Sequence, residues 1–431
     1  MSIVNRRHML KMMALAAGCA AAPSSIAFAG QAPRLARDDE SFLDDLIRQG
    51  CLYFFEQGSP TTGQVLDRAR SDGNGARDSR RMASIAATGF GLTALCIADH
   101  RGYIPHAQVV ERVRTTLQWH LNQMPEVHGF FYHFTDIDSG KRWSNCELSP
   151  IDTSILLCGV QTARAYFADA KIQSLAQQIY ERVDWPWMLN GGSAFAMAWN
   201  PGTGFVNARW NHYCELMMIY LLAIGSPTHP VSPDHWNSFS RPVIHYAGQN
   251  FISGDDPIFT HQYSQAWFDF RHKRDAYTDY FANSIAATRA HKAFCLSMPR
   301  WYSNDYWGIT ASDSRRGYTV WGGPPSRGLI DGTVVPSAAA GSLAFVPADC
   351  LALLRGLRAK YGAQAWGRYG FTDAFNPSAN WFNPDVLGID LGIGVLMAEN
   401  LRSELVWSTF MQNADSSRAM QMVGFRPNGI A

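Results

Sequence analysis

The chain has 431 residues, 47% of them hydrophobic and only 17% charged, which is enough apolar material for a large buried core. Its 37 basic and 36 acidic residues almost cancel. This balance argues against the strongly basic surface that a nucleic-acid or anionic-membrane partner would require.

The first 29 residues have the features of an export signal. An arginine pair at Arg6 and Arg7 precedes a weakly apolar stretch, and Ala27-Phe-Ala29 offers a small-x-small cleavage site. We therefore expect a twin-arginine-like signal at residues 1–29, a linker at 30–38 and a single domain at 39–431. This organisation predicts a periplasmic or secreted protein.

The segment that ends at Cys19 also resembles a lipobox, so a lipid anchor at Cys19 is an alternative form of the same signal. No later apolar run is long enough to span a bilayer. The eight cysteines show neither CxxC nor zinc-ligand spacing, and most of them lie in apolar stretches, as small core residues do. The sequence does not decide whether two of them form a disulfide.

Apolar periodicity predicts about twelve helices of two alternating kinds. One kind is apolar on nearly all sides, as an inner helix would be: residues 84–96, 149–166, 209–224, 337–345 and 390–410. The other kind is amphipathic or mixed, as an outer helix would be: residues 39–57, 106–123, 168–183, 233–247, 275–295 and 347–361. The alternation predicts an all-α fold, an (α/α)6 toroid.

Strand patterns are few and short, at residues 129–134, 194–199 and 317–321. The segments between helices are unusually long: 125–148, 186–208, 249–274, 297–335 and 362–386. Loops of that length inside a compact domain are usually functional. Because most of the tryptophans fall in them, we expect an aromatic-lined cleft at one mouth of the toroid.

Glu215 is the first candidate for chemistry, because it lies just inside the apolar body of the predicted helix 209–224. A buried carboxylate must be paired, hydrogen-bonded or protonated. A carboxyl with a raised pKa beside aromatic rings suits a general acid, whereas the structural alternative is an acid paired with Arg209.

Other acids could complete a pair of carboxylates across a glycosidic bond. Glu147 ends an aromatic loop, and Asp390 opens the last inner helix, where it could also be an N-cap. Asp152 belongs to a capping box with Ser149, which favours a structural role. Asp313 lies among aromatic residues, and Asp331 and Asp373 stand in turn sequences.

Aromatic and hydrogen-bonding side chains near these acids are candidates for binding sugar rings. They are Phe130, Tyr132, Trp210, His261, Tyr263, Trp307, Tyr318 and Trp381, together with Asp152 and Asp313. His261 has no second histidine or cysteine at ligand spacing, and the sequence has no HExxH, P-loop or dinucleotide fingerprint. We therefore expect no metal and no cofactor.

Several of these segments, in order, resemble one family. They are residues 86–94, 129–134, 147–152, Glu215 with 225–230, 259–264, 307–313, 369–376 and 387–390. Together they resemble the glycoamylase-like domain of bacterial β-1,2-glucanases of glycoside hydrolase family 144. The resemblance implies an (α/α)6 barrel, an extracytoplasmic location, no cofactor, and inverting hydrolysis of β-1,2-glucan to sophoro-oligosaccharides. It also implies a catalytic acid at Glu215, with Glu147, Asp152 and Asp390 as cleft carboxylates.

Two other functions fit the same pattern. A toroid that binds glycans without cleaving them would use the same aromatic residues. A polysaccharide lyase would use tyrosine or histidine as its base, but its anionic substrate calls for a basic cleft, which the balanced charge disfavours.

Overall fold

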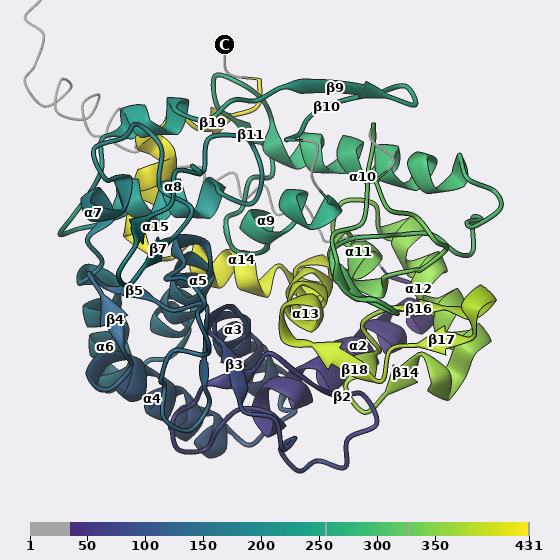
Figure 1. Ribbon diagram of the computed structural model, residues 1–431, viewed down its shortest axis with the longest axis horizontal. Helices are drawn as coiled ribbons and strands as arrows, with labels where there is room; N and C mark the ends of the chain where they lie inside the picture. Colours follow the sequence, from purple (N-terminus) through teal and green to yellow (C-terminus); the bar gives the residue numbers. More distant parts are fainter. Residues whose placement is uncertain (1–34, 255–256, 326–327, 430–431) are drawn as a thin grey trace, which may run out of the picture. The chain divides into compact units, whose positions relative to one another are not determined.

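Six helices with mostly buried side chains line the middle of the fold. They are α3 (Ile85–Arg101), α5 (Pro150–Tyr166), α8 (Met217–Gly225), α9 (Tyr263–Trp267), α11 (Pro336–Ala340) and α13 (Gly388–Ser403). Six others surround them: α2 (Arg37–Glu56), α4 (His106–Asn122), α6 (Ala170–Glu181), α10 (Tyr280–Leu296), α12 (Pro347–Tyr361) and α15 (Ala414–Met422). Figure 1 shows α3, α9 and α13 near the centre and α4, α6, α10 and α12 toward the rim.

This computed structural model describes residues 35–254, 257–325 and 328–429, which belong to one unit. Within them, the two sets of helices confirm the expected (α/α)6 fold. The first helix begins at Arg37, slightly ahead of the predicted domain start at residue 39. The predicted export signal, and with it Cys19, lies outside the described residues.

The remaining elements are short and connect the helices. The helical ones are α7 (Trp185–Leu189), α14 (Leu405–Phe410), η1 (Pro233–Asn237), η2 (Ile258–His261), η3 (Gly362–Gln364) and η4 (Pro377–Ala379). The strands are β1 (Val65–Leu66), β2 (Arg68–Arg70), β3 (Met82–Ser84), β4 (Glu126–Val127), β5 (Phe130–Phe131), β6 (Phe134–Asp136), β7 (Trp199–Asn200), β8 (Gly204–Phe205), β9 (Val243–Tyr246), β10 (Gln249–Ile252), β11 (Lys273–Arg274), β12 (Ser312–Ser314), β13 (Gly317–Thr319), β14 (Trp366–Gly367), β15 (Gly370–Phe371), β16 (Phe375–Asn376), β17 (Trp381–Phe382), β18 (Asp385–Leu387) and β19 (Arg426–Pro427). All their pairings are antiparallel, in the order β1-β3-β6 and in eight two-stranded ladders among the described residues.

The predicted helix 209–224 is wrong in its first half, because α8 begins only at Met217. The preceding backbone is irregular, with bends and isolated bridges, and the amide of Trp210 donates to the carbonyl of Phe195. Ser264 of α9 then fixes the helix start. Its hydroxyl donates to the carbonyl oxygen of Glu215 at 2.6 Å and accepts from the amide of Met218 at 3.1 Å. Glu215 therefore lies just before the helix and not inside it.

The predicted helix 233–247 is also wrong beyond its first turn. After η1 the chain enters the β9–β10 hairpin, whose turn holds Ala247 and Gly248 at φ values of 49° and 76°. The predicted helix 390–410 is real but broken in two at Glu404, which adopts φ 61°. The sequence prediction missed α9, which lies inside the predicted loop 249–274, and α15.

The cysteines of the described part are all free, and six of the seven are buried. They behave as the small core residues that the sequence predicts. None of the described helices combines the length and the apolar character needed to cross a membrane.

Candidate active site

Two adjoining chambers open where the inner helices begin. The first, here the His133 chamber, has about 1230 Å³ of empty space and is lined by Asp67, Arg68, Met82, Ser84, His133, Phe134, Ile151, Asp152, Ile155, Glu215, Phe259, Tyr263, Ala311, Tyr318, Leu387 and Ile389. The second, the Trp210 chamber, has about 1100 Å³ and is lined by Met197, Arg209, Trp210, Asn211, His212, Cys214, Glu215, Gly254, Pro257, Phe259, Thr260, Ala311, Tyr318 and Val320.

The position of these chambers follows from the fold. Ser84 caps α3, Asp152 lies in the first turn of α5, and Tyr263 begins α9. Leu387 is the N-cap residue of α13, and Glu215 lies one residue before Leu216, the N-cap residue of α8. Five inner helices therefore point their N-terminal ends at this region, and the loops before those helices supply its walls.

Glu215 lies at the junction of the two chambers. It lines both of them, together with Phe259, Ala311 and Tyr318, and only 9% of the residue is exposed. A substrate that extended through both chambers would thus pass this carboxyl at its middle. An acid so placed can reach a bond within a bound chain, which is the geometry that bond cleavage requires.

His133 links two of the predicted acids. Its Nδ1 lies 2.8 Å from Oε1 of Glu147, and its Nε2 lies 3.6 Å from Oδ1 of Asp152. Burial by itself lowers the pKa of this imidazole, but the charges of Asp152 and Glu147 outweigh it and raise the pKa to about 9. The hydrogen bond from His133 in turn lowers the pKa of Glu147. His133 is therefore a cation at neutral pH, held between two carboxylates.

The same three side chains have ligand atoms within 4.8 Å of one another, as the ligands of a metal ion would. Each of the three side chains has a hydrogen-bond partner within the protein. Ser149 donates its hydroxyl to Oδ2 of Asp152 at 2.5 Å, and His133 is hydrogen-bonded to Glu147. The amide of Asp152 also donates to Ser149 Oγ at 3.2 Å. Ser149 thus caps α5 as predicted, but the capping box is incomplete, because the amide of Ser149 donates to the carbonyl of Phe131 at 3.0 Å and not to Asp152. Asp152 lines the His133 chamber.

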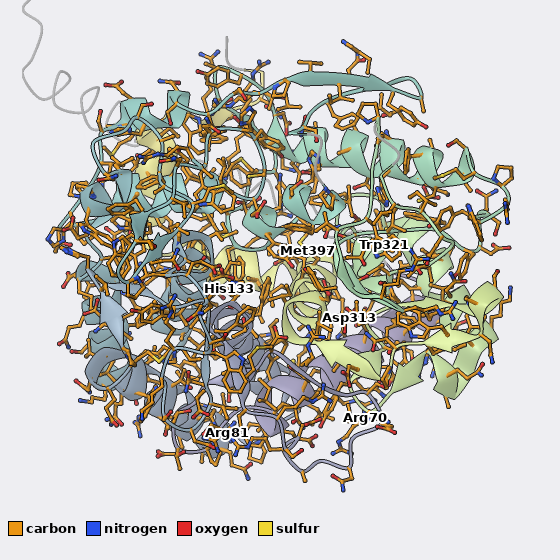
Figure 2. The ribbon with its side chains drawn as sticks, viewed as in Figure 1. Arg70, Arg81, His133, Asp313, Trp321 and Met397 are labelled. Carbon is orange, nitrogen blue, oxygen red and sulfur yellow. The ribbon has the colours of Figure 1, made fainter. Side chains whose placement is uncertain are left out.

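Arg68 also lines the His133 chamber. Its guanidinium donates to Oδ2 of Asp67 at 2.9 Å and to Oδ2 of Asp313 at 2.6 Å, which ties β2 to the β12–β13 hairpin. Burial raises the pKa of Asp67 against the opposing effect of Arg68. His133 and Asp313 are both labelled near the middle of the domain in Figure 2. Asp313 thus belongs to an ion-pair network and does not line either chamber.

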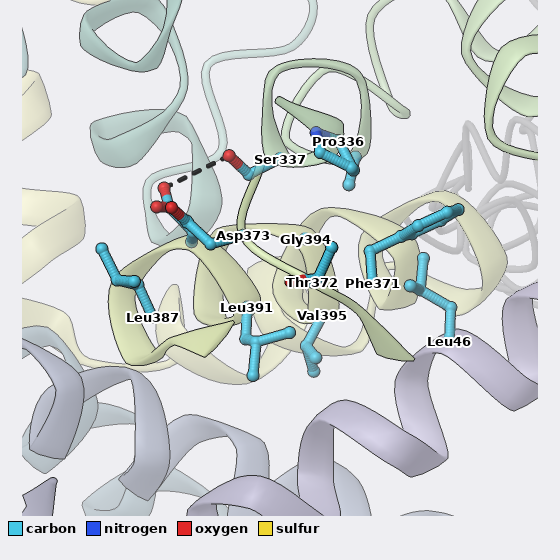
Figure 3. A pocket seen from close by; sticks show the side chains of 12 residues that line it. Leu46, Pro336, Ser337, Phe371, Thr372, Asp373, Leu387, Leu391, Gly394 and Val395 are labelled. Carbon is cyan, nitrogen blue, oxygen red and sulfur yellow. Dashed lines mark hydrogen bonds between the residues drawn. The ribbon is translucent and has the colours of Figure 1, made fainter. Parts of the chain in front are cut away.

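Asp390 lies behind the His133 chamber. It lines a smaller cavity of about 390 Å³ that shares Leu387 with the chamber and also contains Asp373 (Figure 3). Burial raises the pKa of Tyr263, and the charge of Asp390 is the next cause. The carboxyl of Asp390 is therefore within electrostatic reach of a tyrosine that lines the chamber.

The predicted sugar-binding residues fall into three groups. Trp210, Tyr263 and Tyr318 line the chambers, as does Asp152. Tyr132 and Trp381 line neither chamber, and Tyr132 packs its ring against Arg142. Phe130, His261 and Trp307 are at most 3% exposed and line neither chamber. Phe130 packs edge-on to Trp185, and Nδ1 of His261 lies 3.4 Å from the hydroxyl of Tyr213.

Sequence reasoning missed several residues of the site. Asp67 and Arg68 fall at the start of a segment that reads as a polar loop, and the sequence does not show that β2 pairs with β18 at the chamber wall. Asp373 reads as a turn residue but is 4% exposed. His133 could have been predicted as a site residue, because it stands within the aromatic run 129–134, near two candidate acids.

Comparison with known proteins agrees with this geometry. Residues 207–414 match the family model described as "Glycoamylase: Putative glucoamylase". The chain is 28% identical over 429 residues to a curated protein of Parabacteroides distasonis named "Exo beta-1,2-glucooligosaccharide sophorohydrolase (non-reducing end)". That match covers 89% of this chain but 58% of the relative, so the chain spans little more than half of the curated relative's length.

Solved structures give the same result over the whole fold. A crystal structure from Bacteroides uniformis described as a "putative glucoamylase" superposes with a TM-score of 0.84 at 26% identity, covering 92% of this chain and 100% of that one. An endo-β-1,2-glucanase of Chitinophaga pinensis, in complex with sophorotriose and glucose, superposes with a TM-score of 0.81 at 26% identity, covering 91% and 99%. The chain is thus similar to glycoamylase-like proteins and to bacterial β-1,2-glucanases.

Proposed function

We propose that the protein is a glycoside hydrolase that cleaves β-1,2-glucan to sophoro-oligosaccharides. The observation that carries this proposal is the position of Glu215 at the junction of two chambers with walls of both aromatic and charged side chains. The names of the relatives supply the linkage: one is a sophorohydrolase for β-1,2-glucooligosaccharides and another an endo-β-1,2-glucanase.

In this proposal Glu215 is the general acid and protonates the leaving glycosidic oxygen, while a second carboxylate activates water on the opposite face of the sugar. Of the two predicted bases, Asp390 suits the second role better. Glu147 lines neither chamber and is hydrogen-bonded to His133, whereas Asp390 adjoins the His133 chamber. Direct attack of water in place of a covalent intermediate inverts the configuration at the anomeric carbon.

The aromatic residues of the walls would bind the faces of the sugar rings. Trp210 lies in one chamber, Tyr263 in the other, and Tyr318 at the junction. The arginine-paired segment at residues 1–29 supports export to the periplasm or beyond, with a lipid anchor at Cys19 as its alternative form.

The test is product analysis after incubation of the protein with linear β-1,2-glucan, laminarin and lichenan. The proposal expects new reducing ends and short sophoro-oligosaccharides from β-1,2-glucan, and much slower release from the other two. Binding without release of reducing ends would support the non-catalytic toroid instead. Products that absorb ultraviolet light through a new double bond would support the lyase.

A further inference from the structure

The small cavity behind the His133 chamber holds two carboxyl groups at close quarters. Asp373 and Asp390 both line this cavity (Figure 3), and a hydrogen bond between the two side chains raises the pKa of Asp373 and lowers that of Asp390. Asp373 is 4% exposed and Asp390 is 7% exposed. Two buried carboxylates close enough to share a hydrogen bond cannot both carry a charge without a large electrostatic cost.

One oxygen of each carboxyl in the pair accepts hydrogen bonds, and the other oxygen has no donor among the described residues. Oδ2 of Asp373 accepts the backbone amide of Asp313 at 2.8 Å and the side-chain amide of Asn383 at 3.4 Å. Oδ1 of Asp390 accepts the hydroxyl of Ser337 at 3.2 Å. Oδ1 of Asp373 and Oδ2 of Asp390 are buried and have no donor among the described residues.

Two carboxyl oxygens can bond to each other only when a proton lies between them. We propose that Asp373 is a positioning residue: as a neutral carboxylic acid it donates its proton in a hydrogen bond to Asp390 and keeps Asp390 the one charged carboxylate of the pair. The proposal rests on the proposed function, in which Asp390 is the base that takes a proton from water.

The surroundings favour this division of roles. Asp67, Asp313, Tyr263 and Tyr318 face the pair from the neighbouring loops, the β12–β13 hairpin and α9. Arg68, which lines the neighbouring His133 chamber, is bound to Asp67 and Asp313. Burial raises the pKa of both carboxyls, that of Asp373 well above its usual range and that of Asp390 to about 6. In the proposal the proton therefore resides on Asp373, and its hydrogen bond opposes the rise in the pKa of Asp390.

Asparagine reproduces a neutral aspartic acid at this position, since its amide can donate to Asp390 and its oxygen can accept from the amide of Asp313. Leucine removes the donor. We expect Asp373→Asn to keep kcat on β-1,2-glucan within about threefold of the wild type at pH 7, which is under 1 kcal/mol in barrier. We expect Asp373→Leu to move the acidic limb of the kcat profile upward by about one pH unit, with activity recovered at higher pH. Asp390→Asn should be inactive at every pH.

The proposal is overturned if Asp373→Asn is as inactive as Asp390→Asn, because Asp373 would then be the charged member. It is equally overturned if the profile of Asp373→Leu superposes on that of the wild type. Asp349→Asn, on the outer helix α12 and paired with Lys292, is the matched control and should change neither quantity.

A readout without substrate separates this inference from the proposed function. With carbon-13-labelled aspartate, NMR should show one aspartic carboxyl that stays protonated at pH 7 in the wild type and is missing from Asp373→Asn. Its presence in the variant would contradict the inference even if Asp373→Leu does not fold. Its loss would support the inference even if no glucan is cleaved.

Discussion

The backbones of Gly89 and Gly159 touch where α3 crosses α5. A Cβ atom on Gly159 would lie 2.1 Å from the carbonyl oxygen of Gly89, and one on Gly89 would lie 2.3 Å from the carbonyl oxygen of Ile155. No side chain larger than hydrogen fits on either helix at this crossing. Ser84 and Asp152 stand at the N-terminal ends of the same two helices, and both line the His133 chamber.

Gly159→Ala should therefore lower the free energy of unfolding by about 3 kcal/mol or more, since the added methyl group forces the two backbones apart. Gly356→Ala is the control. A Cβ at Gly356, on the outer helix α12, meets nothing within 4 Å, and alanine there should stabilise the protein by about 0.5–1 kcal/mol. Chemical unfolding of both variants measures the difference, and equal effects would refute the close crossing.

Arg68 should matter for both stability and substrate binding. Arg68→Met leaves the carboxyls of Asp67 and Asp313 without their shared cation, which should cost about 2–4 kcal/mol of unfolding free energy. The β12–β13 hairpin would also lose its tie to β2, so KM should rise. Arg70→Met, in the same strand but with an exposed partner in Asp72, should stay within about 0.5 kcal/mol of the wild type. An Arg68 variant as stable as the Arg70 variant would contradict this.

Deprotonation of His133 should lower the free energy of unfolding at alkaline pH. Its pKa is raised in the folded state to about 9 from the ordinary value of 6.5, so the folded chain binds its proton more tightly. This contribution is fully present below pH 6.5 and is lost as the pH rises through 9. Its size is up to roughly 3 kcal/mol.

The measurement is the free energy of unfolding at pH 6, 7.5 and 9.5 for the wild type and for His133→Gln. The difference between the two proteins should shrink across this range. A constant difference would mean that His133 is not charged between Glu147 and Asp152.

Tyr318 should bind substrate through its ring. It lines both chambers, yet 53% of the residue is exposed, so the ring has a free face at the junction. Tyr318→Ala should raise KM about tenfold, equivalent to about 1.4 kcal/mol, and Tyr318→Phe should raise it far less. Tyr277→Ala, at another exposed tyrosine that lines neither chamber, is the control. Equal KM values for the two alanine variants would exclude this role.

The sequence predicts the helical scaffold well because inner and outer helices differ in composition. The small, wholly apolar pattern of residues 84–96 identifies α3 as an inner helix, and the stripes of 106–123 and 347–361 identify α4 and α12 as outer ones. It fails where long-range partners decide the backbone. The start of α8 depends on Ser264 of α9, which no local pattern around Glu215 reveals.

The candidate site shows the same division. Trp210, Tyr263 and Tyr318 could be predicted from aromatic loops next to acids, and they do line the chambers. Phe130 and Trp307 have the same local pattern but face the core, since sequence spacing does not tell which side of a loop a ring occupies. The Asp373–Asp390 pair could not be predicted, because it joins the segment between β15 and β16 to the first turn of α13.

The central claim concerns Glu215, and the most direct measurement is the steady-state rate of β-1,2-glucan hydrolysis by Glu215→Gln beside the wild type and Glu111→Gln, an exposed acid on α4. If Glu215 donates the proton, kcat falls by about 100- to 10,000-fold in Glu215→Gln alone, while its melting temperature and its affinity for sophoro-oligosaccharides stay near those of the wild type. Hydrolysis by Glu215→Gln at a rate near that of Glu111→Gln would contradict the assignment.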